Sequence, residues 1–485
     1  MTDHSGAGPT LVWFRDDLRL RDNPALTWAA SRGPVVGVFI LESPEATLAR
    51  PLGAAAAWFQ REAIRGLHDE LAAHNVPLLL ATGDPREVIP SLAAQLAGAV
   101  TWSRRYHQPF IDLDAHVKTV LANQGTEAKS HSGYLLSEPW VIRTGQGTPY
   151  RKFTPFARNV EDFATGDIAE NPPLDIPAGL HGPRDLELDY PVWELPSLAA
   201  EPAWTKKLQS HWEAGEGGAL NTLQQFVATL SGENLPASSA EVRLGYSDGR
   251  DYPAVAVTSR LSPYLRCGAV SPRTVWATIS EAAERGEIAE SEAGAFRRQI
   301  IWRDFAWHRL YHVPTLATCN VQAKFDRFPW GWNEARDSAE FDAWKRGITG
   351  VPLVDAGMRE LWETGSMHNR VRMVVGSLLT KNLLIHWRLG EEWFWDTLVD
   401  ADYACNPFNW QWVAGCGDDA APYFRIFNPV TQAQKFDKEG IYQQTWVPEA
   451  QTSGGSYPPK PIVDIKQSRA EALAVYESLG QDPRK

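Results

Sequence analysis

Cysteines are few in this chain, and long apolar runs are missing from it. The four cysteines, Cys267, Cys319, Cys405 and Cys416, are scattered along 485 residues without the spacing of a metal site. This scatter argues against a disulfide framework and a zinc site, and it is typical of a reducing cytoplasm. No apolar stretch is long enough to span a bilayer, and the N-terminus shows no secretory signal. We therefore expect a cytoplasmic protein that binds neither a membrane nor a metal.

Positive charge is also scarce. The 47 lysines and arginines are outnumbered by 59 aspartates and glutamates, which gives a formal net charge of -12. This balance argues against nonspecific coating of nucleic acid, but it is compatible with a local basic groove, because phosphate binding depends on the patch. Tryptophan, in contrast, is plentiful, with 21 residues against 13 tyrosines and 18 phenylalanines. We infer that tryptophan serves a purpose besides packing.

The chain is long enough for two or three domains, and its first 130 residues alternate strand-like and helix-like segments. Asn23-Pro24 marks a helix start, and no GxGxxG fingerprint follows the first strand. This rhythm predicts an α/β domain over residues 1–130, with a doubly wound parallel sheet that binds ligands at the carboxyl ends of its strands. The expected strands are Thr10 to Phe14, Val35 to Leu41, Pro77 to Ala81 and Val100 to Trp102, and the expected helices are Ala54 to Ala73 and Pro85 to Leu96.

The remaining chain reads as a linker followed by a larger helical domain. Residues 131–204 include a proline-rich stretch from Gly166 without a sustained period, which predicts an interdomain linker. Residues 205–485 show helical spacing and predict an all-α domain. The helical segments are Trp204 to Leu230, Pro272 to Arg285, Ala293 to His312, Val354 to Thr364 and Val371 to Ile385.

Several polar groups in the helical part have the chemistry of a cofactor site. Thr258, Ser259 and Ser262 place hydroxyls at a helix start, where phosphate can be held, although a plain helix cap has the same pattern. Asp400 and Asp402 bracket one alanine and are typical acceptors for ring or ribose hydrogens, although Asp-Ala-Asp is also a common surface turn.

Aromatic residues offer two further sites. Gln299, Trp302 and Arg303 share a helix face, which suits a stacked base beside a phosphate but also a core tryptophan under a solvent-facing arginine. Three other indoles fall within twenty-six residues, and a further pair lies in the sequence FPWGW. Packing explains any one indole, whereas a spaced set can carry electrons to a buried redox cofactor. These indoles are Trp387, Trp410, Trp412, Trp330 and Trp332.

Five motifs together resemble the DNA photolyase and cryptochrome family over nearly the whole chain, and the class I photolyases of cyclobutane pyrimidine dimers look most similar. The motifs are LVWFRDDLRLRDNPAL, TSRLSPYL, MHNRVRM, NWQW and DAAPYFRIFNP. The resemblance implies the two-domain fold, with one FAD held in the larger all-α FAD-binding domain. It also implies a monomer that acts on UV-damaged DNA as a light-driven carbon-carbon lyase.

The resemblance assigns roles residue by residue. Catalytic roles fall on Gln299, Asn369, Met373 and Asn406. Electron transfer is assigned to Trp410, Trp387 and Trp330, with Trp332 as the alternative to Trp330 at the outer end of the relay. DNA contacts fall on Arg250, Gln299, Trp302, Arg370, Trp412 and Arg425. FAD contacts fall on Tyr246, Thr258, Ser259, Arg260, Leu261, Ser262, Arg303, Asn369, Arg372, Asp400, Asp402 and Asn406.

The chain departs from the family pattern at three places. Gln299 stands where most dimer photolyases have Glu, so we expect dimer repair with the (6-4) photoproduct as a second substrate; the (6-4) enzymes have Gln here together with a His pair that this chain lacks. Ser366 replaces a Trp beside the flavin pocket. Pro109 and Phe110 argue against a folate near Tyr106, which leaves a deazaflavin, a flavin or no second antenna chromophore.

Two other functions compete with repair. A cryptochrome-type blue-light receptor would bind a partner and repair nothing, and a flavin electron-transfer protein would not bind DNA. Asn406 stands where photolyases keep an asparagine beside the reactive ring nitrogen, whereas plant and animal cryptochromes usually differ there. This residue favours repair.

Overall fold

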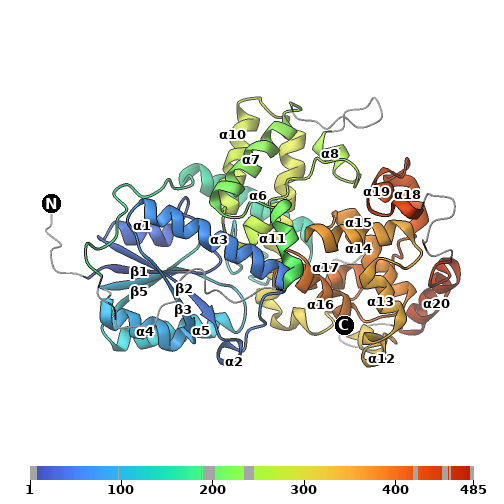
Figure 1. Ribbon diagram of the computed structural model, residues 1–485, viewed down its shortest axis with the longest axis horizontal. Coiled ribbons are helices and arrows are strands. Elements are labelled where there is room, and N and C mark those ends of the chain that lie inside the picture. Colours follow the sequence, from blue (N-terminus) through green and yellow to red (C-terminus); the bar gives the residue numbers. More distant parts are fainter. Residues whose placement is uncertain are drawn as a thin grey trace.

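The chain forms an α/β half and a helical half that lie side by side (Figure 1). The computed structural model describes residues 8–96, 98–186, 188, 202–233, 245–418, 424–450, 457 and 460–480. None of the helices in these ranges is both long and apolar enough to cross a membrane. The fold class expected from the sequence is confirmed.

The α/β half contains a parallel sheet of five strands in the order β3-β2-β1-β4-β5. The order reverses beside β1, because β2 and β4 flank it on opposite sides. Ligands of such sheets bind outside the carboxyl ends of the strands at this reversal. The strands are β1 (Thr10–Phe14), β2 (Val35–Glu42), β3 (Leu78–Gly83), β4 (Ala99–Ser103) and β5 (Glu127–His131).

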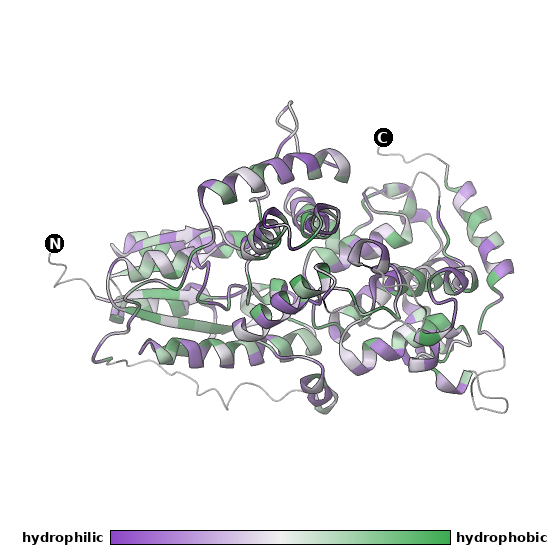
Figure 2. Ribbon diagram, turned by 90° about the horizontal axis from the view of Figure 1, so that it is seen from above, coloured by the Kyte–Doolittle hydropathy of each residue, from purple (hydrophilic) through white to green (hydrophobic). Residues whose placement is uncertain are grey.

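Helices cover both faces of the sheet, α1 (Pro24–Ala30) and α3 (Ala54–Ala73) on one face and α4 (Pro85–Leu96) and α5 (Phe110–Asn123) on the other (Figure 1). Alternate residues of β1 serve the two faces, because side chains along a strand point to opposite sides. Val12 and Phe14 join the cluster under α3, whereas Leu11 and Trp13 join the cluster under α4 and α5. The central strand β1 is therefore apolar and buried along its whole length, and Figure 2 shows the hydrophobic residues of the sheet between the helices of its two faces.

The sequence predicted four of the five strands within about two residues. It also predicted the first helix start, where the Asn23 side chain accepts a hydrogen bond from the Leu26 N–H at 3.1 Å. Strand β5 was missed because Glu127–His131 is a polar edge strand without a buried residue. Hydrophobic periodicity cannot detect such a strand. Two helices of this half, α2 (Pro44–Thr47) and α5, were not among the expected helices either.

The predicted linker contains a long helix. Helix α6 (Phe153–Glu170) begins within residues 131–204 and packs its apolar face against α11 of the helical half. The described residues after it, up to 186, form no helix or strand. Residues 189–201 of this segment lie outside the described part of the chain. The domain boundaries stay predictions.

The helical half follows the predicted segments with two interruptions. Trp204 to Leu230 is divided before Gly215, whose φ of 95° is a left-handed conformation that favours glycine. The expected helix from Val371 ends early and continues as a π-helical turn, η5. The elements are η2 (Ala203–Ser210), α7 (Glu216–Leu230), α8 (Tyr246–Gly249), α9 (Ser262–Cys267), α10 (Pro272–Glu284), α11 (Glu290–His312), η3 (Pro314–Ala317), η4 (Ala323–Arg327), α12 (Asn333–Arg336), α13 (Ala339–Arg346), α14 (Pro352–Thr364), α15 (Asn369–Ser377), η5 (Leu378–Asn382), α16 (Trp387–Thr397), α17 (Cys405–Ala414), α18 (Pro429–Phe436), α19 (Ile441–Trp446), η6 (Pro448–Ala450) and α20 (Ile465–Ser478).

One loop of the α/β half is built into the helical half. The Tyr403 hydroxyl donates to the Arg50 carbonyl at 2.7 Å, and the Trp395 indole donates to the Pro51 carbonyl at 2.8 Å. Gly53 is required here, because a Cβ atom on it would lie 1.9 Å from the Trp395 carbonyl oxygen. The loop therefore supports α16 and the polar segment that precedes α17.

Candidate functional site

Three of the predicted flavin residues form one polar cluster. A carboxylate oxygen of Asp400 accepts the Ser262 hydroxyl at 2.7 Å, and the Arg372 guanidinium donates to the same oxygen at 3.1 Å. The Arg372 Nε donates to the Met367 carbonyl at 2.7 Å, which fixes the guanidinium. The cluster thus joins the start of α9, the first turn of α15 and the loop before α17.

Asp402 and Arg303 lie together in the interior. Asp402 accepts the backbone N–H groups of Ala404 and Cys405 at 2.8 and 2.5 Å, which holds the loop before α17 in place. Burial raises the pKa of Asp402, and the charge of Arg303 opposes this shift. The two terminal nitrogens of Arg303 donate to backbone carbonyls, those of Tyr134 and Leu265, at 2.8 and 3.0 Å. Arg303 of α11 therefore links the backbone at Tyr134 to the backbone of α9 at Leu265.

Asn406 is oriented by a carboxylate that the sequence did not point to. Its side-chain nitrogen donates to the Glu391 backbone carbonyl at 3.1 Å and to a Glu391 carboxylate oxygen at 2.8 Å. Arg50, from the α/β half, donates to both Glu391 oxygens at 2.8 and 2.9 Å. Burial raises the pKa of Glu391, against the effect of Arg50. Both amide hydrogens of Asn406 are thus used, which leaves its carbonyl oxygen as an acceptor.

The predicted phosphate segment is ordered around Ser259. The Ser259 hydroxyl accepts the Leu261 N–H at 3.4 Å, and Thr258 is exposed. Arg260 turns toward the start of the helical half, where it donates to the His211 carbonyl at 3.0 Å and lies 4.3 Å above the Trp212 ring.

Tyr246 is buried at the start of α8, next to this segment, and burial raises the pKa of its hydroxyl to about 12. Arg250, one turn along, donates to that hydroxyl at 3.5 Å. The hydroxyl therefore stays protonated at physiological pH.

Gln299, Arg250 and Arg370 form a half-buried surface. The Gln299 carbonyl oxygen accepts from Arg250 at 3.0 Å, and its amide nitrogen donates to the Ala295 carbonyl at 3.2 Å. Arg370 pairs with Asp251 at 2.5 Å, and its guanidinium lies 4.3 Å above the Phe436 ring. Asn369, on the same turn of α15 as Arg370, is exposed.

The structure divides three residues with predicted DNA-contact or catalytic roles, Trp302, Trp412 and Met373, between two hydrophobic clusters. Trp302 stacks on Phe153 with ring centroids 3.4 Å apart and planes inclined by 2°, and it packs against the cluster that extends into the α/β half. Met373 and Trp412 pack against the second cluster, and the Trp412 ring is 6.5 Å from that of Phe427. One face of Trp302 is covered by Phe153, so at most the other face can receive a base.

The inner residues of the predicted electron relay lie on neighbouring helices. The Trp410 ring on α17 covers Gly390 of α16, where a Cβ atom would lie 2.2 Å from the Trp410 Cη2 atom. Gly390 follows Trp387 by three residues, so both share a face of α16. Trp387 is fully buried and donates its indole N–H to the Asn320 side chain at 2.8 Å. The helix packing therefore brings the faces that carry Trp410 and Trp387 together.

Arg425 and Arg370 line a groove of about 810 Å³ between α18, α20 and residues 424–428. The groove also contains Lys435 of α18 and Arg469 of α20, two cations that no sequence motif had indicated. Glu477 is an acidic side chain in its wall. The local charge is therefore positive although the whole chain is acidic.

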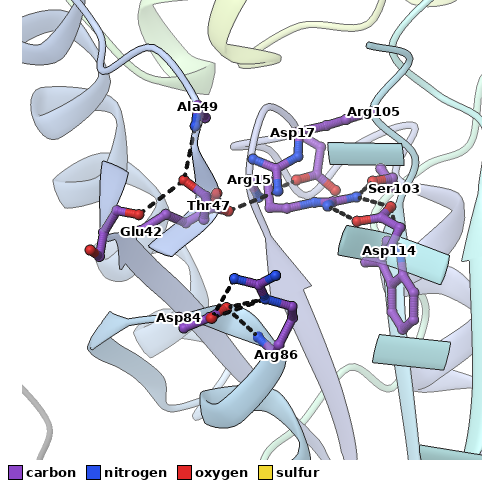
Figure 3. Close-up of polar contacts among 12 residues, drawn as sticks. Arg15, Asp17, Glu42, Thr47, Ala49, Asp84, Arg86, Ser103, Arg105 and Asp114 are labelled. Carbon is purple, nitrogen blue, oxygen red and sulfur yellow. Dashed lines mark hydrogen bonds and ion pairs between the residues drawn. The ribbon is translucent and has the colours of Figure 1, made fainter. Parts of the chain in front are cut away.

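The carboxyl edge of the sheet carries a second polar site (Figure 3). Arg15 makes two bonds to the Asp114 carboxylate at 2.6 and 3.0 Å, and Arg105 pairs with Glu42 at 2.8 Å. Neither ring nitrogen of the buried His107 has a hydrogen-bond partner among the described residues, and burial lowers its pKa to about 3. Most of the charged side chains at this edge are thus paired with one another. A second chromophore at this edge stays a prediction.

The described ranges contain no cluster of three or more side chains that could hold a metal ion. All four cysteines have free thiols. Glu391, Arg50 and Asp251 were missed because each acts through a partner distant in sequence. Lys435 and Arg469 were missed because only the fold brings their two helices to one groove.

The residues of the site fit a flavin. A reduced isoalloxazine ring presents N–H donors, which the Asn406 carbonyl oxygen and the Asp400 carboxylate can accept. The hydroxyls of Thr258, Ser259 and Ser262 lie on the next segment, where they suit the polar part of a dinucleotide. Arg372 balances the charge of Asp400.

Two family models match the chain. Residues 10–177 match DNA photolyase, and residues 296–458 match the FAD binding domain of DNA photolyase. The chain belongs to the DNA photolyase family. It is an enzyme of the photolyase type, and its helical half is an FAD-binding domain.

Individual relatives support this conclusion. A deoxyribodipyrimidine photo-lyase from Agrobacterium fabrum is 41% identical, over 97% of this chain and 98% of the relative. A crystal structure of a bacterial class III photolyase from Agrobacterium tumefaciens is 40% identical, with a TM-score of 0.87 over 98% of both chains. Cryptochrome-2 of Arabidopsis thaliana is 32% identical, over 91% of this chain and 70% of the relative. The expected similarity to class I enzymes in particular is not confirmed.

Proposed function

We propose that this photolyase repairs UV-induced pyrimidine dimers, with the cyclobutane dimer as its main substrate and the (6-4) photoproduct as a second one. The lesion is turned out of the duplex into the site, as enzymes that act on bases require. FAD, when bound and reduced, supplies an electron to the lesion under light and recovers it after the ring opens.

The observation that carries this proposal is the placement of two arginines on one turn of α15. Arg372 points to Asp400 among the flavin residues, whereas Arg370 lies with Asp251 and Phe436 beside the basic groove. One helical turn thus connects the cofactor side to the DNA side. A DNA lesion bound at Arg370 would lie close to the flavin.

The chain's own residues position and polarise the lesion. Arg250 accounts for the orientation of the Gln299 amide, because its donation to the carbonyl oxygen directs the amide nitrogen away from Arg250. That nitrogen has a second hydrogen beyond the one given to Ala295, and it can donate to a carbonyl of the lesion. Gln299 can stabilise negative charge on the lesion by hydrogen bonding, but it cannot transfer a proton at neutral pH.

Lesion preference is tested by illuminating pre-reduced enzyme with DNA that contains one defined photoproduct. We expect wild type to open cyclobutane dimers, and we expect Gln299→Glu to raise that yield severalfold while it lowers any (6-4) repair. A glutamate next to Arg250 keeps the charge-assisted contact and adds a group that can be protonated. Product is measured by chromatography of the repaired strand.

The control for this experiment is Gln432→Glu, which makes the same change in the wall of the basic groove. It should leave the ratio of the two repair yields unchanged. A wild-type enzyme that opens no cyclobutane dimer would show that the proposed substrate is wrong.

The basic groove explains how an acidic protein can hold DNA. Arg370, Arg425, Lys435 and Arg469 line one continuous space, and Arg370 links it to Gln299 through Asp251 and Arg250. Phosphate oxygens bind well to such cations. We therefore place the backbone next to the lesion in this groove.

Charge reversal tests the groove. For Lys435→Glu with Arg469→Glu we expect weaker binding to damaged and undamaged DNA alike, because phosphate contacts do not read the lesion. The slope of log affinity against log salt is negative, and each lost contact should make it less steep by about 0.9. The control is Lys466→Glu. Lys466 is exposed and lies on α20, as Arg469 does, but it does not line the groove. An unaltered salt slope would contradict the placement.

The cryptochrome alternative makes a different forecast. A receptor without repair activity would still be reduced by light but would leave both lesions intact in the same assay. Asn406 favours repair, because the two bonds of its amide nitrogen to Glu391 orient its carbonyl oxygen as an acceptor, which would suit an N–H of a reduced flavin ring.

A further inference from the structure

Trp330 and Trp332 lie on either side of an isolated β-bridge between Gly331 and Ile385. The Gly331 N–H donates to the Leu384 carbonyl at 2.8 Å, and the Gly331 carbonyl accepts from the His386 N–H at 3.0 Å. Residues two apart in an extended segment project to the same side. The bridge therefore turns both indoles toward one neighbour on the facing segment, next to Ile385.

That neighbour is His386, whose imidazole contacts three indoles. Its ring centroid lies 5.3 Å from that of Trp330, 5.0 Å from that of Trp332 and 5.6 Å from that of Trp387. Trp387 is the middle residue of the proposed relay. The imidazole thus stands between the middle of the relay and both candidates for its outer end.

His386 is held in place and kept neutral. Its Nδ1 atom accepts the Arg388 N–H at 3.1 Å as the cap of α16, which puts the ring proton on Nε2. Burial, with the nearby charge of Arg388, lowers the pKa of His386 to about 4. A neutral ring does not oppose positive charge on the indoles around it, whereas an imidazolium would.

The two outer indoles have different surroundings. Trp330 is 9% exposed and donates its N–H to the Thr380 carbonyl at 2.7 Å. Trp332 is half-buried under the guanidinium groups of Arg336 and Arg388, at 5.4 and 5.1 Å. Positive charge is therefore better tolerated on Trp330, while Trp332 is more accessible to a reductant in solution.

We propose that the relay forks at His386, so that Trp330 and Trp332 can each supply Trp387 with an electron. This inference rests on the proposed light-driven repair and on the electron relay through Trp410 and Trp387 that the family resemblance implies. One electron leaves Trp410 for the excited cofactor, Trp387 refills Trp410, and an outer indole refills Trp387. The oxidised outer indole regains its electron from a thiol in solution, which completes the balance.

Single and double substitutions test the fork. Blue light and dithiothreitol are applied to Trp330→Phe, Trp332→Phe, the double variant and Trp387→Phe, each loaded with FAD. Cofactor reduction is followed by absorbance, and the tryptophanyl radical by transient absorption. We expect each single variant to keep a clear fraction of the wild-type rate, and the double variant to fall to the level of Trp387→Phe.

His386→Asn tests the junction itself. Asparagine is also a preferred N-cap, so α16 should remain intact while the aromatic bridge is removed. We expect radical transfer to both outer indoles to slow. A wild-type rate in this variant, or a Trp330→Phe rate as low as that of Trp387→Phe, would refute the fork. If the cofactor is reduced in Trp387→Phe at the wild-type rate, the relay through Trp387 is refuted instead, whereas the proposed repair function is not affected.

Discussion

Replacement of Trp410 by phenylalanine is expected to reduce light-driven reduction of the cofactor to the background level. Trp410 packs against Phe394 at 4.9 Å and covers Gly390 of α16. A phenyl ring fits the same space, because it is smaller and equally apolar, but it is much harder to oxidise than indole. The variant should therefore fold and bind FAD while it loses the first donor of the relay.

Two measurements separate this loss from damage to the site. Cofactor reduction under blue light with a thiol should disappear, whereas repair by chemically pre-reduced enzyme should persist. Trp344→Phe is the matched control, since Trp344 is also buried and its ring lies 6.2 Å from that of Trp410. Equal loss of photoreduction and repair in Trp410→Phe would refute the relay role.

Local signals in the sequence account for most of the fold. The apolar runs of β1 to β4 predicted the sheet, because strands covered on both faces must be apolar throughout. Edge strand β5 has no such run. The break before Gly215 and the π-helical turn at Leu378 lie in segments whose helical period continues, so the period gave no warning of either.

The site was predictable where it coincides with a motif. Ser262 and Arg372 come from two of the motifs and Asp400 from the Asp-Ala-Asp segment, and the structure joins them by direct hydrogen bonds. The roles of these residues toward a flavin stay predictions. The Arg303 guanidinium, expected at the flavin, donates to two backbone carbonyls, a use that the motif does not reveal.

Long-range pairs had no signature in the sequence. Arg50 and Glu391 are 341 residues apart and meet only because a loop of the α/β half lies against α16. The position of His386 among three indoles depends on the Gly331 bridge, which no periodicity predicts. Features of this kind need the folded chain, because the partner, and not the residue, defines the function.

Asp400→Ala is expected to leave the purified enzyme with little or no flavin. The change removes the acceptor of the Ser262 hydroxyl and leaves the Arg372 guanidinium without its carboxylate. Hydrogen bonds to charged groups contribute about 1.5–3 kcal/mol each. The loss of one corresponds to about ten- to a hundredfold weaker binding. Flavin content is measured by absorbance after denaturation, and affinity by titration of the apoprotein.

Asp400→Asn distinguishes the two contributions of this carboxylate. An asparagine can still accept the Ser262 hydroxyl but cannot neutralise Arg372, so flavin retention should fall between wild type and Asp400→Ala. Asp342→Ala is the control, because Asp342 lies in an exposed helical ion pair, which contributes little. If Asp400→Ala retains full flavin with wild-type affinity, Asp400 does not hold the cofactor, and the Ser262–Asp400–Arg372 cluster serves only to join α9 to α15.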